Sequence, residues 1–277
     1  AELGGGILEN GIVKTVSIQA AEKVTRRATL VARGTAGHGS MPLQDNAVAI
    51  LANAVSKAAA WQTEIRLNDI TEMYFDRLAD ISKPEEARRY RNIGNPDETE
   101  DIRKHLAETS PYHSSVLRTS VVPTIMEAGF RNNVIPSEAT AVLDIRMLPD
   151  EDVDGFYRML AEVINDPRVE VVPEPIYRPA ADPSPIDSEM FQSLEKVAKQ
   201  MYPETTVLPI MSTGATDMAM VRAKGMAAYG IGPVSTAEDS SGGRGMHGDD
   251  ERISEESMKQ FVQFLWYTIL DIAGAQH

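Results

Sequence analysis

The chain has 277 residues, 42% of them hydrophobic, which is enough to bury a sizeable core, and we expect two domains. Its 41 acidic and 27 basic residues give a net charge of -14 without any basic run, so nucleic acid is not an expected partner. The absence of cysteine excludes disulfides and leaves metal binding to His, Asp and Glu, and no apolar run approaches the roughly 20 residues that span a bilayer.

The first half of the chain begins with predicted strands and then changes in composition. Residues 12–20 alternate in hydrophobicity and are β-branched, and residues 28–32 resemble them, so both are predicted strands. An amphipathic helix is predicted over 46–60. Residues 61–118 are highly charged, weakly helical and broken by prolines. We interpret them as a helical insertion that packs on a scaffold without a core of its own.

The middle of the chain completes a recognisable order of elements. After the insertion come two predicted strands, a helix and a further strand, over residues 119–127, 139–146, 151–164 and 169–172. With the strand at 28–32 and the helix at 46–60, the order is strand, helix, strand, strand, helix, strand. This order is that of a ferredoxin-like α+β sandwich.

A linker and an α/β segment follow. Residues 173–185 hold five prolines. Beyond them the predicted elements are a helix capped by Asp187, a strand over 207–211, a short helix over 217–224, a strand over 226–231 and a helix capped by Ser254. The last helix carries an apolar stripe that we expect to face the core, made of Met258, Phe261, Val262, Leu265, Trp266 and Ile269.

Two domains follow from these elements. The C-terminal α/β segment is too small for a complete sheet, so we expect residues 181–277 to join residues 1–23 in part of a doubly wound α/β domain. Residues 24–180, including the helical insertion at 61–118, form the inserted domain.

Four short motifs occur in order. They are Glu2 before the glycines at 4–6, Gly-His-Gly-Ser at 37–40, Asn-Val-Ile-Pro at 133–136 with Asp-Ile-Arg at 144–146, and Gly-Ala-Thr-Asp at 214–217 ahead of His247. On these motifs the chain resembles the co-catalytic di-zinc metallopeptidases, which include aminoacylases, glutamate carboxypeptidases, carnosinase-type dipeptidases and succinyl-diaminopimelate desuccinylase. The resemblance covers nearly the whole chain, with residues 61–118 the least similar. It implies that residues 24–180 are a lid and dimerisation domain inserted into a zinc-exopeptidase catalytic domain.

The resemblance implies two metal ligands in this chain. Glu2 matches the acidic residue of the family's Glu-Gly-Gly motif, although a leucine here separates it from the glycines, and His247 matches the family's last zinc ligand. Without the resemblance, Glu2 is interpreted as a solvated terminal carboxylate and His247 as a surface-loop histidine. Two zinc ions are the implied cofactor, and other divalent metals stay open.

The resemblance also implies catalytic and substrate-binding roles. His38 would reach into the partner subunit's active site and donate to the oxyanion, or is a turn histidine bonded to nearby backbone. Asn133 and Arg146 would hold the substrate's carboxylate or oxyanion. The alternatives are a turn cap for Asn133 and an ion pair with Asp144 for Arg146. The loop expected to cradle the substrate's carboxylate consists of Gly214, Ala215 and Thr216.

Several family ligands have no counterpart in this sequence. The His-x-Asp motif, the bridging Asp and the Glu-Glu pair that includes the general base all precede the Glu-Gly-Gly motif in the family. They would lie before Ala1, so the chain resembles an N-terminally truncated member. We therefore expect this chain alone to be inactive and to bind zinc weakly, because a catalytic zinc needs about three protein ligands.

The sequence thus predicts a metallo-hydrolase of exopeptidase or aminoacylase type that cleaves a peptide or N-acyl bond next to a free carboxylate. Dipeptidase, carboxypeptidase, aminoacylase and carbamoyl-amino-acid hydrolase activities stay open, as does a non-catalytic dimerisation or scaffold module. The expected partners are a small peptide or N-acyl amino acid and a second copy bound through the lid. A soluble, cytoplasmic protein is favoured, but a leader before Ala1 would not be visible.

Overall fold

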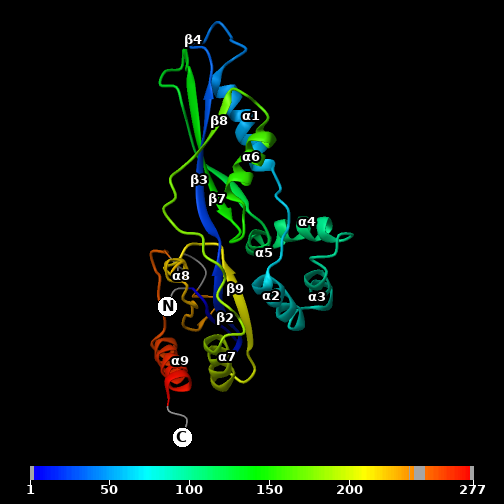
Figure 1. Cartoon of the computed structure of the whole chain (residues 1–277), viewed down its shortest axis with the longest axis vertical. Helices are drawn as coiled ribbons and strands as arrows, with labels where there is room; N and C mark the ends of the chain where they lie inside the picture. The colour runs from blue at the N-terminus through cyan, green and yellow to red at the C-terminus, as the bar shows by residue number, and fades with distance from the viewer. Residues whose placement is uncertain (1–2, 237, 240–246, 275–277) are drawn as a thin grey trace. The chain divides into compact units, whose positions relative to one another are not determined.

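The computed structural model describes residues 3–236, 238–239 and 247–274. The chain divides into two compact units, each built from separate segments (Figure 1). Unit 1 comprises Ala1–Glu22, Arg66–Leu117 and Ala180–His277, and unit 2 comprises Lys23–Ile65 and Arg118–Pro179. Within the described ranges, no helix combines the length and the apolar character needed to cross a membrane.

Unit 2 contains an antiparallel four-stranded sheet with the order β5-β7-β3-β8. Its strands are β3 (Val24–Arg33), β5 (Ser120–Ala128), β7 (Glu138–Met147) and β8 (Val169–Pro173). In chain order these strands alternate with two helices as β3, α1 (Ala47–Ala60), β5, β7, α6 (Val153–Ile164), β8. The predicted ferredoxin-like order of elements is therefore confirmed, and the strand order within the sheet agrees with it.

One face of this sheet is covered by α1 (Ala47–Ala60) and α6 (Val153–Ile164), as Figure 1 shows. The side chain of Asn46 caps α1 and the side chain of Asp152 caps α6, each accepting a backbone N–H of the first turn. Alternate residues of β3 and β7 point into the shared core, which follows from the two-residue period of a strand.

Unit 1 contains a second four-stranded sheet, with the order β10-β1-β2-β9. Its strands are β1 (Gly5–Glu9), β2 (Ile12–Glu22), β9 (Thr206–Ser212) and β10 (Ser235–Thr236). The strand β2 runs antiparallel to β1 and parallel to β9. The core of the unit joins this sheet to α7 (Glu189–Met201) and α9 (Glu255–Ala273), through residues such as Ile18, Phe191 and Phe264.

The helical insertion packs on unit 1. It forms α2 (Asp69–Asp80), α3 (Pro84–Arg91), α4 (Thr99–Thr109) and α5 (Pro111–Val116). The sequence placed residues 61–118 in the 24–180 domain, whereas the structure groups 66–117 with unit 1. Carbonyl groups on the outer edge of β9 explain this packing, because Arg77 Nη1 donates to Val207 O (2.8 Å) and the Tyr112 hydroxyl donates to Met211 O (3.1 Å).

Two local predictions in unit 1 are wrong. Residues 226–231 do not form a strand, and only an isolated bridge joins Gly230 to Gln19. The cap of α7 is Ser188, whose hydroxyl accepts the N–H of Phe191, and Asp187 lies one residue outside it. The helix expected over 217–224 is shorter, α8 (Met218–Arg222), with Asp217 at its N-cap position.

The stripe predicted on the last helix is only partly buried. Ser254 caps α9 as expected, but the side chains buried along the helix are Phe264 and Thr268. Four members of the predicted stripe are exposed, namely Met258, Val262, Trp266 and Ile269. Helical periodicity identified an apolar face correctly, but in the described part of the chain nothing buries most of it.

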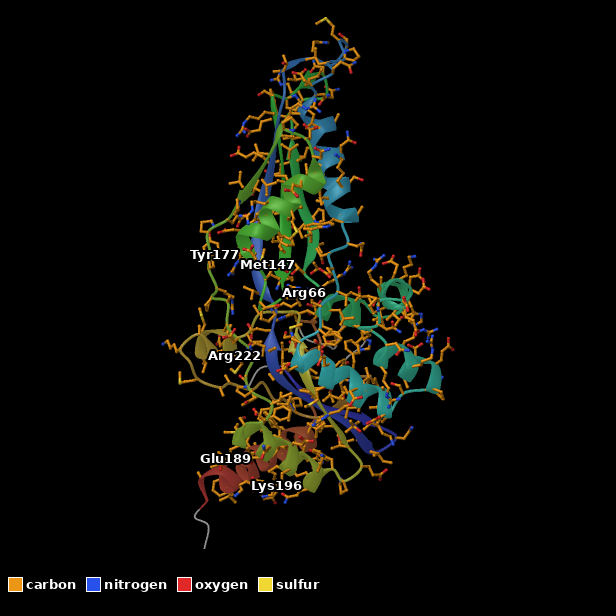
Figure 2. All side chains as sticks on the ribbon, turned by 45° about the vertical axis from the view of Figure 1, so that its right-hand side comes forward. Arg66, Met147, Tyr177, Glu189, Lys196 and Arg222 are labelled. Atoms are coloured by element: carbon orange, nitrogen blue, oxygen red, sulfur yellow. The ribbon has the colours of Figure 1, made fainter. Side chains whose placement is uncertain are left out.

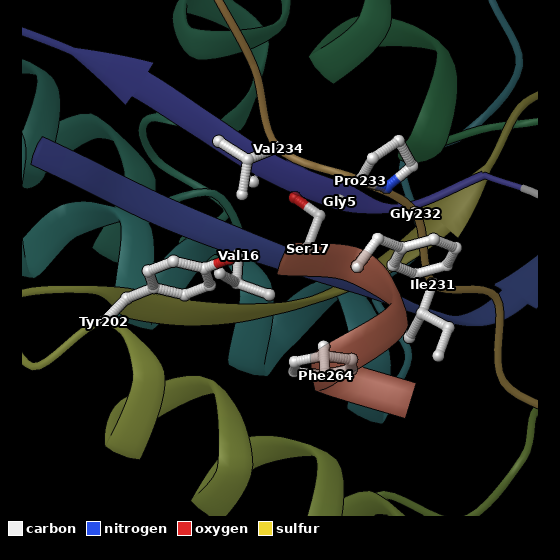
Figure 3. Close-up of a pocket in the computed structure, with 11 residues that line it drawn as sticks. Gly5, Val16, Ser17, Tyr202, Ile231, Gly232, Pro233, Val234 and Phe264 are labelled. Carbon is white, nitrogen blue, oxygen red and sulfur yellow. The ribbon is translucent and has the colours of Figure 1, made fainter. Parts of the chain in front are cut away.

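The N-terminal strand is fixed by two glycines with positive φ. Gly4 has φ +110° and Gly5 has φ +112°, a region that favours glycine. A Cβ built on Gly5 would lie 2.3 Å from Pro233 O. Figure 3 shows Gly5 close to Gly232 and Pro233, beside a small apolar cavity that Phe264 also lines. Only glycine lets β1 approach the 232–234 segment this closely.

We expect Gly5→Ala to destabilise unit 1 by about 2–3 kcal/mol, because the new methyl group meets backbone that cannot move independently. Gly11→Ala is the matched control, since Gly11 also has positive φ (+80°) but has open space around it. Gly11→Ala should lower the unfolding free energy by only about 1 kcal/mol. Denaturant unfolding measures both, and equal losses would refute the role given to close approach.

Lys23, the first residue of unit 2, is almost completely buried, with 1% of its surface exposed. Its Nζ donates to Arg118 O (2.8 Å) and to Ser120 Oγ (3.1 Å). Burial, followed by repulsion from Arg118 and Arg146, lowers the pKa of Lys23 to about 7. The unfolded chain, with an ordinary lysine pKa of about 10.4, binds this proton more tightly than the folded chain does.

This difference makes stability rise with pH. Between about pH 7 and pH 10 the unfolded state holds up to one more proton at Lys23, so unfolding free energy should increase by at most about 1.4 kcal/mol per pH unit. Lys23→Met should remove this contribution, while Lys83→Met, at an exposed position, should retain it. Chemical unfolding of wild type and both variants across this pH range tests the prediction. Parallel curves of unfolding free energy against pH for wild type and Lys23→Met would contradict the assignment.

Candidate functional site

Two predicted site residues of unit 2 lie side by side. His38 belongs to the short strand β4 (Gly37–His38), which pairs with β6 (Val134–Ile135), so that His38 faces Val134 across the ladder. The next residue, Gly39, donates its N–H to the carbonyl O of Asn133 (2.8 Å). Both His38 and Asn133 are exposed. The pairing of two distant motifs therefore brings His38 and Asn133 onto one loop cluster.

The hydrogen bonds of His38 fix its tautomer. The backbone N–H of Ser40 donates to Nδ1 of His38 (3.2 Å), and the Ser40 hydroxyl lies 2.8 Å from the same atom. A backbone N–H can only donate, so Nδ1 is the acceptor and the neutral ring carries its proton on Nε2. His38 thus presents an N–H donor on the side of the ring away from its own turn.

Arg146 lies elsewhere on the sheet and has a partner. Its Nε and Nη2 donate to the two carboxylate oxygens of Asp144 (2.6 and 2.9 Å), and Nη1 donates to Thr25 Oγ1 (3.2 Å). The hydrogen bond to Asp144 raises the pKa of Arg146. At about 3.3 Å per residue, the length of β7 separates Arg146 from the His38 cluster by roughly 25 Å. The ion pair considered from the sequence is present, and a substrate role for Arg146 stays a prediction.

The predicted carboxylate-binding loop lies in unit 1, ahead of α8. Gly214 N–H donates to Ser212 Oγ (3.0 Å). Thr216 is buried, its N–H donates to Glu22 Oε1 (3.0 Å), and its hydroxyl donates to Glu22 Oε2. A carboxylate of the chain itself therefore already occupies the Thr216 end of the Gly214, Ala215, Thr216 loop.

Glu22 is the centre of a buried polar network that sequence reasoning missed. Arg222 Nη1 donates to Glu22 Oε2 (3.3 Å), and both side chains are almost fully buried. Figure 2 labels Arg222 on the short helix α8. Gln19 Nε2 donates to the same carboxylate oxygen (3.2 Å). The only sequence signal was a pair of polar residues, Gln19 and Glu22, within an otherwise apolar strand end.

The structure describes only one of the two predicted metal ligands. Glu2 lies outside the described residues. His247 is exposed, has φ +63°, and donates its backbone N–H to Glu251 Oε2 (3.0 Å). Among the described residues no group of three or more His, Asp or Glu side chains could hold a metal ion. These residues therefore do not fit a complete zinc site, and both ligand assignments stay predictions.

Comparison with known proteins places the chain. The family model of the peptidase dimerisation domain, M20_dimer, matches residues 21–172, more than half of the chain. "Probable carboxypeptidase S-like 2" of Dictyostelium discoideum is 30% identical over 84% of this chain and 44% of its own length. The human "N-fatty-acyl-amino acid synthase/hydrolase PM20D1" is 25% identical over 96% of this chain and 53% of its own length.

Solved structures share the fold. An M20 family metallo-carboxypeptidase from Sulfolobus solfataricus aligns with a TM-score of 0.57 at 17% identity, covering 97% of this chain and 61% of that one. The chain spans about half the length of the curated relatives it matches. With the ordered motifs and the ferredoxin-like unit 2, the family match leads to one conclusion: the chain belongs to the M20 metallopeptidase family and carries its dimerisation domain.

Proposed function

We propose that the chain is the lid domain (24–180, apart from the helical insertion, which groups with unit 1) and the C-terminal part of the catalytic domain (1–23 and 181–277) of a metallo-hydrolase that cleaves a peptide or N-acyl amide bond next to a free carboxylate. The pairing of β4 with β6 carries the proposal. It holds His38 and Asn133 together on the domain that the family model matches. The activities for which the relatives are named, on peptides and on N-acyl amino acids, agree with this class of bond.

In this proposal His38 stabilises the oxyanion of a substrate bound to a second copy. Its Nε2–H is free of the contacts that Ser40 makes with Nδ1, and the Ser40 contacts hold the ring in place. A preorganised donor of this kind typically contributes about 3–4 kcal/mol to lowering the barrier. Asn133, bonded through its backbone to the same turn, supplies an amide at the same place.

The free carboxylate of the substrate is assigned to Arg146 and to the Gly214 loop. Arg146 already holds a carboxylate, that of Asp144, with two parallel N–H bonds, which is the geometry a substrate carboxylate would use. In the loop, Thr216 is engaged by Glu22 and fixes the shape of the loop. The Gly214 N–H donates to Ser212 Oγ, so direct substrate contact falls to the backbone of Ala215, and Gly214 helps to shape the loop.

Metal ions are typical of the M20 family, and zinc would activate the attacking water in this proposal. The described residues supply His247 as a candidate ligand and Glu2 lies outside them, so a complete site needs further ligands. We assign these ligands to polypeptide upstream of Ala1, in line with relatives about twice as long. The 277-residue chain alone is then inactive and binds zinc weakly.

A second candidate is a dimerisation or scaffold module without chemistry. It is favoured by two observations: the family match covers the dimerisation domain itself, and the described residues contain no group that could hold a metal ion. The presence of His-x-Asp, Asp and Glu-Glu motifs in the upstream reading frame would support the enzyme, and their absence would support the scaffold.

Hydrolysis assays distinguish these functions. Supplied with zinc, the 277-residue chain should release nothing from dipeptides, N-acetyl amino acids or N-fatty-acyl amino acids, whereas the polypeptide extended upstream should hydrolyse at least one class. In the extended form, His38→Ala should lower kcat about 10²–10³-fold with little change in KM, because the lost donor acts on the transition state. His105→Ala is the control, since His105 pairs with Glu86 in unit 1.

Each outcome has a clear meaning. Turnover with stoichiometric zinc by the 277-residue chain would contradict the missing-ligand assignment. An extended polypeptide that folds and binds zinc but cleaves none of these substrates would contradict the hydrolase. Equal losses in His38→Ala and His105→Ala would remove His38 from the catalytic role.

We also propose a homodimer through unit 2, at the sheet edge formed by β5. Val122, Ile125 and Met126 on this edge strand each leave about half of their surface exposed. Exposed apolar residues on an unpaired edge favour pairing with a second copy.

The double variant Ile125→Asp with Met126→Lys should therefore be monomeric at micromolar concentration, where the wild type should be a dimer, by light scattering. Val172→Asp, on the opposite edge strand β8 and also exposed, should remain dimeric. A monomeric wild type, or a dimeric double variant, would refute this interface.

A further inference from the structure

A polar pocket lies in unit 2 where β8 separates from β3. The last backbone–backbone hydrogen bond between the two segments is Glu174 N–H donating to Arg27 O (3.0 Å). Beyond it the chain passes Pro175, which has no N–H to continue the ladder, and Figure 2 labels Tyr177 on this extended segment. The separation leaves a pocket of about 350 Å³. All of its lining residues belong to unit 2.

The floor of the pocket is a buried cation without a counter-ion. Arg26 is 6% exposed, and its Nη1 donates to two neutral acceptors, Thr25 O and Arg178 O, both at 2.9 Å. Its Nε is buried with no acceptor, and no carboxylate of the described chain pairs with it. A guanidinium keeps its proton even when it is buried. The desolvation cost of its charge therefore persists until an anion approaches.

The walls of the pocket carry more positive than negative charge. Arg27 and Arg178 line it together with Arg26, whereas Glu174 is the one carboxylate among the lining residues. The Arg27–Glu174 distance of 4.0 Å is at the limit of an ion pair, so this carboxylate compensates the cluster only weakly. A local excess of guanidinium groups in a chain of net charge -14 marks a place that attracts anions.

An exposed aromatic ring completes the pocket. Tyr177 is 73% exposed, and Pro175 beside it is also exposed. A ring next to guanidinium groups suits a ligand with a flat or apolar part attached to its anionic group. The volume of about 350 Å³ falls in the range of small-molecule sites.

We propose that this pocket binds a small organic anion, whose carboxylate or phosphate group pairs with Arg26, Arg27 and Arg178 while its apolar part lies against Tyr177. The site goes beyond the proposed hydrolase, because none of the residues assigned to catalysis, substrate or metal lines it. Binding here can be measured directly on the 277-residue chain, whatever its hydrolytic activity.

Calorimetric titration of the 277-residue chain tests the site with four probes: inorganic phosphate, benzoate, phenyl phosphate and neutral benzyl alcohol. Phenyl phosphate should bind with one-to-one stoichiometry and more tightly than inorganic phosphate, and benzyl alcohol should not bind. Comparison of benzoate with phenyl phosphate identifies which oxyanion the pocket prefers. Failure of all three anions to saturate the protein at millimolar concentration would overturn the proposal.

Single variants locate the binding. Arg27→Gln and Arg178→Gln should each weaken the affinity for phenyl phosphate by about tenfold, because each removes one charge-assisted contact. Tyr177→Ala should weaken the binding of phenyl phosphate but change the Kd of inorganic phosphate by no more than about twofold. Arg26 is kept, since removing it takes away the donor to both Thr25 O and Arg178 O.

Arg33→Gln is the matched control, an exposed arginine at the other end of β3, paired with Glu138 and Glu170. It should leave all affinities unchanged. If Arg33→Gln weakens binding as much as Arg27→Gln does, the anion responds to overall charge and the pocket is not a site.

Discussion

The buried ion pair between Glu22 and Arg222 is the interaction on which unit 1 depends. It joins the end of β2 to α8, two elements far apart in the chain, and the same carboxylate holds the N–H and hydroxyl of Thr216. Removing one member of such a pair typically costs about 3–5 kcal/mol, because the other charge stays buried. The shape of the Gly214 loop, and with it any carboxylate-binding role of the loop, therefore relies on Glu22 more than on the loop's own sequence.

Unit 2 obeys a different constraint, which is the length of its strands. Because β7 is ten residues long, its two ends cannot serve one small substrate: the His38 cluster lies at one end and Arg146 near the other. If His38 and Arg146 act on one substrate, as proposed, they must therefore come from different copies of the chain. The Arg26 pocket adjoins the Arg146 end through Thr25, whose carbonyl accepts from Arg26 and whose hydroxyl accepts from Arg146.

The sequence predicted the features that repeat locally and missed those made between distant segments. Two-residue alternation marked β3 and β7 and their order with α1 and α6, and ordered motifs pointed to the family. Periodicity could show that α9 has an apolar face but not whether another element covers it. No pattern could show that Arg77 would cap the edge of β9, or that Glu22 would meet Arg222, because each contact joins segments over a hundred residues apart.

The pairing of β2 with β9 also affects the order in which the two units can form during biosynthesis. Thr15 pairs with Thr206, so β2 leaves the ribosome long before its parallel neighbour and before α7 covers its apolar side chains. The segments of unit 2 end at Pro179 and are complete during this interval, whereas unit 1 also needs the C-terminal helix. Long-range parallel pairing is slow, and an early unpaired strand is exposed to aggregation. The unit that holds the Gly214 loop is therefore the last to form and the one for which chaperone protection matters most.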